Sequence, residues 1–278
     1  MTNHDLRISS KRYLKGNWGT AIVLSIILVV LSGLVTSLVE RVFGPSTQEI
    51  ISPNNLENFQ SADLLSLVNP RSTFLSMLLT TIFTGLFRVG YSWGYLDLVD
   101  ETDEYGRGSL RFESLLSALN RDGLKTILVM IITTFLTTLG YILFIIPGIF
   151  LTILYMPIYY VRRDEPELSI GQTLSRSMNL MSGNKLQYIK LVLPYMLIFI
   201  GAILLPLGLV LIGLAGSEAL LGPMLLLIFA VPIFLFFYAI YFSIKLEILN
   251  ASFYRHVLVS YNPGENYQGE DIHYQGYE

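Results

Sequence analysis

The sequence predicts an all-α membrane protein, a polytopic bundle of six transmembrane helices with cytoplasmic N- and C-termini and short amphipathic surface helices. Hydrophobic residues make up 53% of the chain and charged residues only 14%, whereas about 25% of a typical soluble domain is charged. The apolar residues occur in long uncharged blocks, and about 20 apolar residues in a helix span the hydrocarbon core of a bilayer. The distribution of lysine and arginine between the blocks predicts the number of crossings.

Five uncharged blocks divide the chain: residues 17–39, 72–87 with a continuation to 96, 126–161, 191–217 and 219–244. The first block follows a basic stretch at the N-terminus. It is too long for the apolar region of a cleavable signal peptide, about 7 to 15 residues, and no small-residue cleavage site follows it. We therefore interpret this block as a retained transmembrane helix.

The third block decides the topology, because it is 36 residues long and contains a Pro-Gly pair. The segments on either side of it, 97–125 and 162–190, are both rich in lysine and arginine. Basic residues favour the cytoplasmic side, so the two segments lie on the same side and the block between them crosses twice. With six crossings, 15 of the 18 basic residues are cytoplasmic.

The chain is therefore predicted to contain one membrane domain, residues 1–258, followed by a polar cytoplasmic tail, residues 259–278, that we expect to be disordered. The six predicted helices span about 18–41, 72–97, 124–146, 148–163, 188–215 and 221–246. Pro147 and Gly148 form the predicted turn, and Pro147 begins the return helix, where its missing N–H costs nothing. The return arm is short at the helical rise of about 1.5 Å per residue, so it either extends past the following arginines or turns below the outer surface.

A cytoplasmic surface helix is predicted at about 169–182. Ser169 and Gln172 have the spacing of a capping box, and the apolar residues that fall on one face are Ile170, Leu174, Met178 and Met181. Such a helix either seals the bundle against lipid headgroups or contacts a protein partner. The basic N-terminal stretch predicts a second surface helix, attracted to anionic lipids at the cytoplasmic face.

Arg88 is the one charge well within a predicted transmembrane helix. An ionisable group inside a membrane is expensive and is therefore a candidate functional residue. Polar side chains at four-residue spacing surround it, and the third and fourth helices carry further polar stripes. The predicted intramembrane polar site comprises Arg88, Thr84, Thr80, Thr134, Thr137, Tyr141, Tyr155 and Tyr159. The alternative is that these hydroxyls bond to their own or neighbouring helices, while Arg88 extends to lipid phosphates.

Gly90 and Gly94 form a GxxxG pattern, which lets another helix approach closely. Asp97, Asp100 and Glu104 follow, and they share one face if the helix continues. Carboxylates at this spacing suit a divalent cation. No chelating loop and no second ligand cluster accompany them, so we favour a solvated helix end.

The residues that enzymes usually need are missing. The chain has no cysteine, and its three histidines lie near the ends, at positions 4, 256 and 273. Histidine-based catalysis and metal binding are therefore not expected within the membrane, and the chain has no HExxH, GxSxG or phosphate-binding glycine motif. We predict that the protein is not an enzyme and has no catalytic residues, metal, cofactor or nucleic-acid partner.

Four stretches carry a family resemblance: "SKRYLKGNWGTAI", "LFIIPGIF", "DEPELSIGQTLSRSMNLMSGNK" and "NASFYRHVL". Together they resemble the bacterial integral membrane proteins grouped as domain of unknown function 975, over roughly residues 8–258. The run 146–185 is the most specific part. The resemblance implies a six-helix bacterial membrane protein and assigns no functional residue.

Two classes of function are open. The first, which we expect, is a non-enzymatic membrane scaffold or accessory protein that engages lipids or a protein partner. The second is a small-molecule transporter or transporter subunit with a polar path near Arg88 and the threonine stripes of helices 2 and 3. A packed interior around Arg88 and Thr137 would exclude the second class, whereas a water-filled cavity would favour it. For either class we expect a multi-pass protein of the bacterial plasma membrane.

Overall fold

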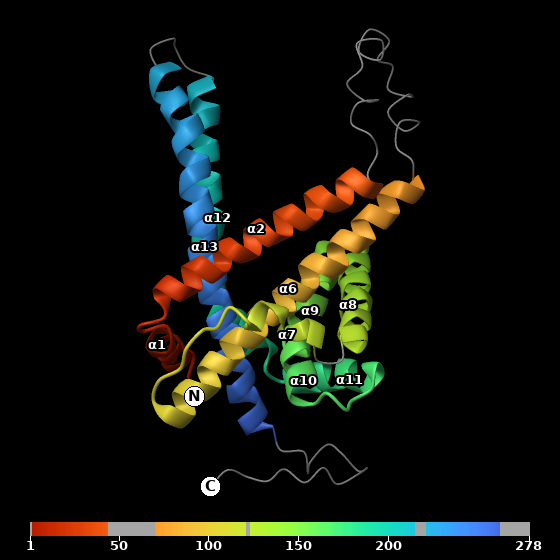
Figure 1. Ribbon diagram of the computed structural model, residues 1–278. Coiled ribbons are helices and arrows are strands. Elements are labelled where there is room, and N and C mark those ends of the chain that lie inside the picture. The colour runs from red at the N-terminus through yellow and green to blue at the C-terminus, as the bar shows by residue number, and fades with distance from the viewer. Residues whose placement is uncertain (1, 44–69, 121–122, 215–220, 262–278) are drawn as a thin grey trace.

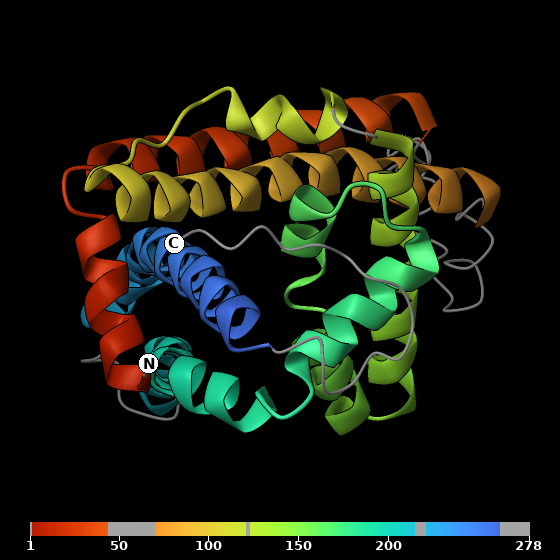
Figure 2. The same ribbon diagram turned by 90° about the horizontal axis from the view of Figure 1, so that it is seen from below.

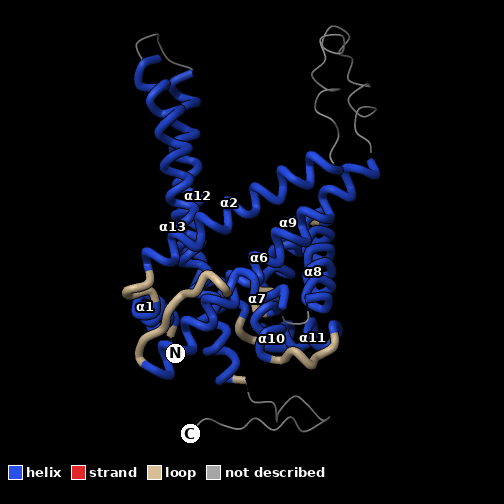
Figure 3. The backbone as a smooth tube through the Cα atoms, viewed as in Figure 1, coloured by secondary structure: helices blue, strands red, loops and turns tan. Residues whose placement is uncertain are grey.

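The computed structural model describes residues 2–43, 70–120, 123–214 and 221–261, and these residues form helices and no strand. Figures 1 and 3 show long helices above a cluster of shorter ones. Six helical segments of the described chain are long and apolar enough to cross a membrane. The long helices are α2 (Trp18–Phe43), α6 (Pro70–Tyr105), α8 (Gly123–Leu143), α12 (Lys185–Leu214) and α13 (Leu221–Ser260), and the remaining span is formed by α9 (Ile145–Leu154) with α10 (Ile158–Asp164). The described residues thus contain the predicted number of candidate spans.

Two helices are longer than predicted. The second helix extends to Tyr105 instead of ending near residue 97, and the last extends to Ser260 instead of ending near residue 246. Both extensions carry charged side chains, which the prediction took as helix ends. The predicted tail, residues 259–278, therefore begins within α13. Residues 262–278 of this tail lie outside the described part of the chain.

The return arm is two helices instead of one over 148–163. Helix α9 begins at Ile145, after Phe144 adopts an extended conformation, so Pro147 lies in the first turn and not at the first position. A proline remains tolerated there, because the N–H groups of a first helical turn have no intrahelical partner. Pro157 separates α9 from α10, since its ring and its missing N–H interrupt a helix.

The α8–α9 hairpin is closed by two glycines. A Cβ on Gly140 would lie 3.1 Å from the Cα of Gly148, and a Cβ on Gly148 would overlap the ring of Tyr141. The Tyr141 hydroxyl in turn pairs with the Thr152 hydroxyl at 3.1 Å. The hairpin therefore depends on the absence of side chains at both positions.

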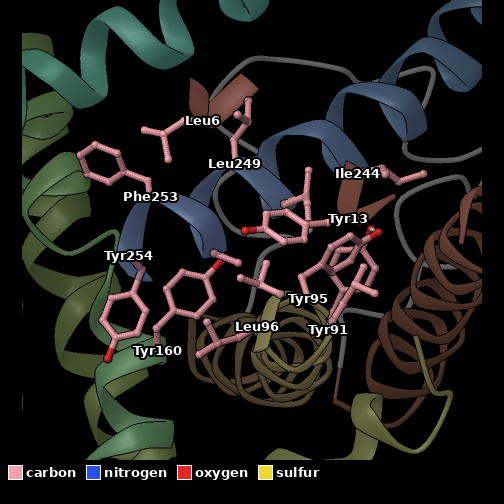
Figure 4. Packing of buried hydrophobic residues seen from close by; sticks show 14 of the residues in the cluster. Leu6, Tyr13, Tyr91, Tyr95, Leu96, Tyr160, Ile244, Leu249, Phe253 and Tyr254 are labelled. Carbon is pink, nitrogen blue, oxygen red and sulfur yellow. Dashed lines mark hydrogen bonds between the residues drawn. The ribbon is translucent and has the colours of Figure 1, made fainter. Parts of the chain in front are cut away.

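The shorter helices gather at one end of the bundle, where the N-terminus and the end of α13 also lie (Figure 1). They are α1 (Asn3–Tyr13), α7 (Ser114–Asn120), α10 and α11 (Ile170–Met181). Seen from this end, the last turns of α13 occupy the centre, with α6 on one side and α1 and α12 on another (Figure 2). The main hydrophobic core lies here, and Figure 4 shows Tyr91, Tyr95, Tyr160, Phe253 and Tyr254 packed within it.

Helix α1 packs against this core and is hydrogen-bonded to its neighbours. Its Leu6 and Tyr13 are buried, and Arg7 donates hydrogen bonds to the backbone carbonyls of Lys190 and Leu191 in α12. The Tyr13 hydroxyl donates to Asp103 at 3.0 Å. Burial and the neighbouring Asp103 charge raise the pKa of Tyr13 to about 12, so this hydroxyl keeps its proton at neutral pH.

A charged clamp, which we define as Arg163, Arg255, Asp97, Asp100 and Asp164, joins α6, α10 and α13. Arg255 binds Asp100 through two hydrogen bonds of 2.6 Å and also contacts Asp164. Arg163 contacts Asp97, Asp100 and Asp164. The favoured interpretation of a solvated helix end is therefore corrected for Asp97 and Asp100.

Replacing Gly148 with alanine should destabilise the hairpin by about 1–3 kcal/mol, because the added methyl group overpacks it. Thermal unfolding in detergent measures the effect. Gly33→Ala is the matched control, since no atom lies within 4 Å of the position that its Cβ would occupy. Equal unfolding midpoints for the two variants would contradict the close packing.

Replacing Arg255 with methionine should lower the free energy of unfolding by about 2 kcal/mol, because the partly buried Asp100 and Asp164 each lose one of their two arginine partners. Arg111→Met is the control: Arg111 also pairs with a carboxylate, Glu101, but its side chain is 65% exposed against 25% for Arg255. Denaturant unfolding in detergent should show a much smaller loss for Arg111→Met. An equal loss of unfolding free energy in both variants would refute the claim that the charged clamp stabilises the bundle.

Candidate functional site

A cavity of about 770 Å³ lies among α2, α6, α8, α9, α10, α12 and α13. Its volume is within the range of about 300–1,000 Å³ typical of small-molecule sites. Six of the eight residues predicted for the polar site line this cavity: Thr84, Arg88, Thr134, Thr137, Tyr155 and Tyr159. The polar stripes of α6, α8 and the return arm therefore face a common space.

Thr80 and Tyr141, the other two predicted residues, are not among the lining residues. The Thr80 carbonyl accepts a hydrogen bond from the Thr84 hydroxyl at 2.6 Å, one turn along α6. Tyr141 lies in the hairpin, where its hydroxyl pairs with Thr152. Their neighbours do line the cavity: Thr81, next to Thr80 on α6, and Thr152, the partner of Tyr141.

The hydroxyls of three threonines donate hydrogen bonds to backbone carbonyls of their own helices. Besides Thr84, the hydroxyl of Thr133 donates to the Val129 carbonyl at 2.8 Å, and that of Thr137 to the Thr133 carbonyl at 2.7 Å. This is the local bonding that the alternative interpretation described. What these side chains offer to the cavity is acceptor oxygen.

Arg88 supplies the positive charge of the cavity. Its side chain is exposed in the structure and lines the cavity. It interacts electrostatically with Glu247 and Tyr159, but within the described part of the chain its guanidinium makes no direct hydrogen bond or ion pair. Arg88 therefore has five N–H donors available to a ligand or to water.

Glu247 is the functional candidate that the sequence analysis missed. Its side chain is buried, 6% exposed, and lines the cavity from α13. Its Oε2 accepts hydrogen bonds from the Ser92 hydroxyl at 3.0 Å and the Tyr160 hydroxyl at 3.2 Å. The prediction ended the last helix at about residue 246, so Glu247 fell just outside it. The apolar residues that continue beyond Glu247 were the available signal.

Four tyrosines line the cavity, and one of them, Tyr160, contacts Glu247. Tyr155, Tyr159 and Tyr160 from the return arm and Tyr188 from α12 line the cavity. The Trp93 indole donates to the Tyr159 carbonyl at 2.8 Å, which ties α10 to α6 and places these rings. After the break at Pro157, Tyr160 of α10 contacts α13 through Glu247 and Tyr254.

Gly90 and Gly94 lie outside the cavity, at the contact between α6 and α7. A Cβ on Gly90 would lie 2.7 Å from the backbone carbon of Leu115, and one on Gly94 would lie 2.9 Å from the Cβ of Ser114. The element that approaches the GxxxG pattern closely is thus the short helix α7. This contact holds the segment between α6 and α8 against the bundle.

No group of three or more histidine, cysteine, aspartate and glutamate side chains suited to a metal ion occurs among the described residues. The expectations of no catalytic residue, no metal and no cofactor stay predictions. The cavity instead combines a cation, a buried carboxylate, acceptor hydroxyls and tyrosine rings. This combination suits reversible binding of a polar molecule.

In comparisons with known proteins, no family model, no curated protein and no solved structure matches the chain. The class of the protein therefore rests on its helices, six of which, among the described residues, are long and apolar enough to span a membrane. The resemblance to domain of unknown function 975 stays a prediction.

Proposed function

We propose that the protein is a small-molecule transporter or transporter subunit of the bacterial plasma membrane, and that it binds its substrate in the cavity between Arg88 and Glu247. The observation that carries this proposal is the polar cavity among the membrane helices, with Arg88 exposed to it. Ionisable groups that face a cavity within a bundle typically mark substrate or ion pathways. A cavity borders Arg88 and Thr137. The condition that would exclude a transporter, a packed interior around these two residues, is therefore not met.

The proposed orientation places α1, α7, α11 and the end of α13 at the cytoplasmic face. These elements share one end of the bundle (Figure 1), and the predicted basic segments lie there. Lys11 and Lys15 on and after α1 are exposed, which suits contact with anionic lipid headgroups.

Helix α11 supports the second candidate function, the non-enzymatic scaffold or accessory protein. The side of α11 that packs on the bundle carries Thr173, Ser177, Leu180 and Met181. Of the predicted apolar face over 169–182, Met178 remains 40% exposed and Leu174 half-buried. These side chains are available to lipid headgroups or to a protein partner.

The absence of cysteine from the chain makes the cavity testable by thiol labelling. In Thr137→Cys, a charged, membrane-impermeant methanethiosulfonate should modify the thiol in detergent or nanodiscs, because position 137 lines the cavity. Mass spectrometry measures the rate.

The control for this labelling is Phe135→Cys. Phe135 lies two residues away on α8, is 64% exposed and is not a lining residue, so in nanodiscs it should face lipid and react slowly. Slow modification of both cysteines would show a dry interior and refute the proposed function.

Single cysteines also test the orientation. In intact cells, an impermeant maleimide should label Val42→Cys, and should label Arg107→Cys and Leu186→Cys only after permeabilisation. Val42 and Leu186 are both 70% exposed, so access to the thiol is set by the side of the membrane. Labelling of position 186 in intact cells would overturn six crossings with cytoplasmic termini.

A further inference from the structure

Two opposite charges line the same cavity without forming an ion pair. Arg88 makes no direct hydrogen bond or ion pair within the described part of the chain, and Glu247 accepts hydrogen bonds only through Oε2, from Ser92 and Tyr160.

The distance between the two charges is set by α6. Arg88 and Ser92 are one helical turn apart on this helix, and Ser92 is the residue that holds Glu247. Four residues of a helix rise about 6 Å. Arg88 and the residue that holds Glu247 are therefore close along α6, an arrangement that suits a short ligand with one charge at each end.

The chemistry of the two ends differs. At the first end, Arg88 offers a planar set of N–H donors that matches phosphate or carboxylate oxygens. Near Glu247, the cavity offers a carboxylate oxygen, Oε1, with no hydrogen bond from the described residues, and the ring of Tyr160, whose hydroxyl donates to Oε2. Tyr155, Tyr159 and Tyr188 also line the cavity. Tyrosine rings beside a carboxylate bind an ammonium group through cation–π and ionic attraction.

We propose that the cavity binds a zwitterion, with its phosphate or carboxylate on Arg88 and its ammonium group between Glu247 and the tyrosines. This proposal rests on the proposed function, because it names the substrate class of that same site. A phosphate joined to an ammonium by two carbons has this chemistry. It occurs both as free phosphoethanolamine and as the headgroup of phosphatidylethanolamine, and the cavity chemistry is shared by the two sources.

The test uses the full chain with Thr137→Cys and measures protection of the thiol from the charged methanethiosulfonate. Phosphoethanolamine, or a short-chain phosphatidylethanolamine in mixed micelles, should slow modification, whereas phosphate alone and ethanolamine alone should protect far less. Protection by phosphoethanolamine identifies a free zwitterion as a ligand. Protection by the lipid alone identifies the lipid headgroup, and both results support the zwitterion.

Arg88→Gln and Glu247→Gln should each raise the concentration for half-protection about tenfold or more, because each removes a charged hydrogen-bond partner. Arg88→Lys should retain part of the protection. Arg41→Gln and Glu40→Gln, exposed neighbours at the end of α2 that are not lining residues, should leave protection unchanged.

Two results would overturn the proposal that the cavity binds a zwitterion. One is a thiol that reacts rapidly but is protected by neither zwitterionic probe. The other is protection that survives both Arg88→Gln and Glu247→Gln. In either case the rapid reaction leaves the proposed water-accessible cavity intact, whereas an unreactive thiol at position 137 refutes the proposed function itself. Unchanged thermal unfolding of the two variants separates lost binding from lost folding.

Discussion

The fixed register between α6 and α13 is the constraint on which the cavity depends. Ser92 meets Glu247, and Asp100 meets Arg255; both pairs are 155 residues apart in the chain, and eight residues separate the two contacts on each helix. Eight residues are about two helical turns. The ion pairs of Arg255 therefore set the height and rotation of α13, and with them the position of Glu247 on the cavity wall.

A third helix completes this arrangement. Tyr160 and Asp164 are one turn apart on α10, and they contact Glu247 and Arg255 respectively. The short helix can do this because Pro157 separates it from α9 and gives it its own direction. The same break brings Tyr155 and Tyr159 to the cavity, so the feature that interrupts the return arm also builds the aromatic wall.

The number of spans, the polar stripes and the surface helix could be predicted because each leaves a one-dimensional pattern: uncharged blocks, four-residue spacing, or a capping box. The roles of Glu247 and Asp100 could not, because a charge beside an apolar block looks the same whether water or a partner helix satisfies it. Only the contacts with Ser92, Tyr160 and Arg255 distinguish the two cases. Thr80 and Tyr141 do not line the cavity although Thr81 and Thr152 do, because four-residue spacing gives only the approximate face of a helix and not the side chains that border a cavity.

The separation of Arg88 from Glu247 has an energetic meaning. Within a low-dielectric bundle, a direct ion pair with good hydrogen bonds is the cheapest state for two opposite charges. Here Glu247 takes its hydrogen bonds from hydroxyl groups, and Arg88 remains exposed to the cavity. A ligand that carries both charges recovers the missing interactions, which is why the open arrangement favours binding over a structural role.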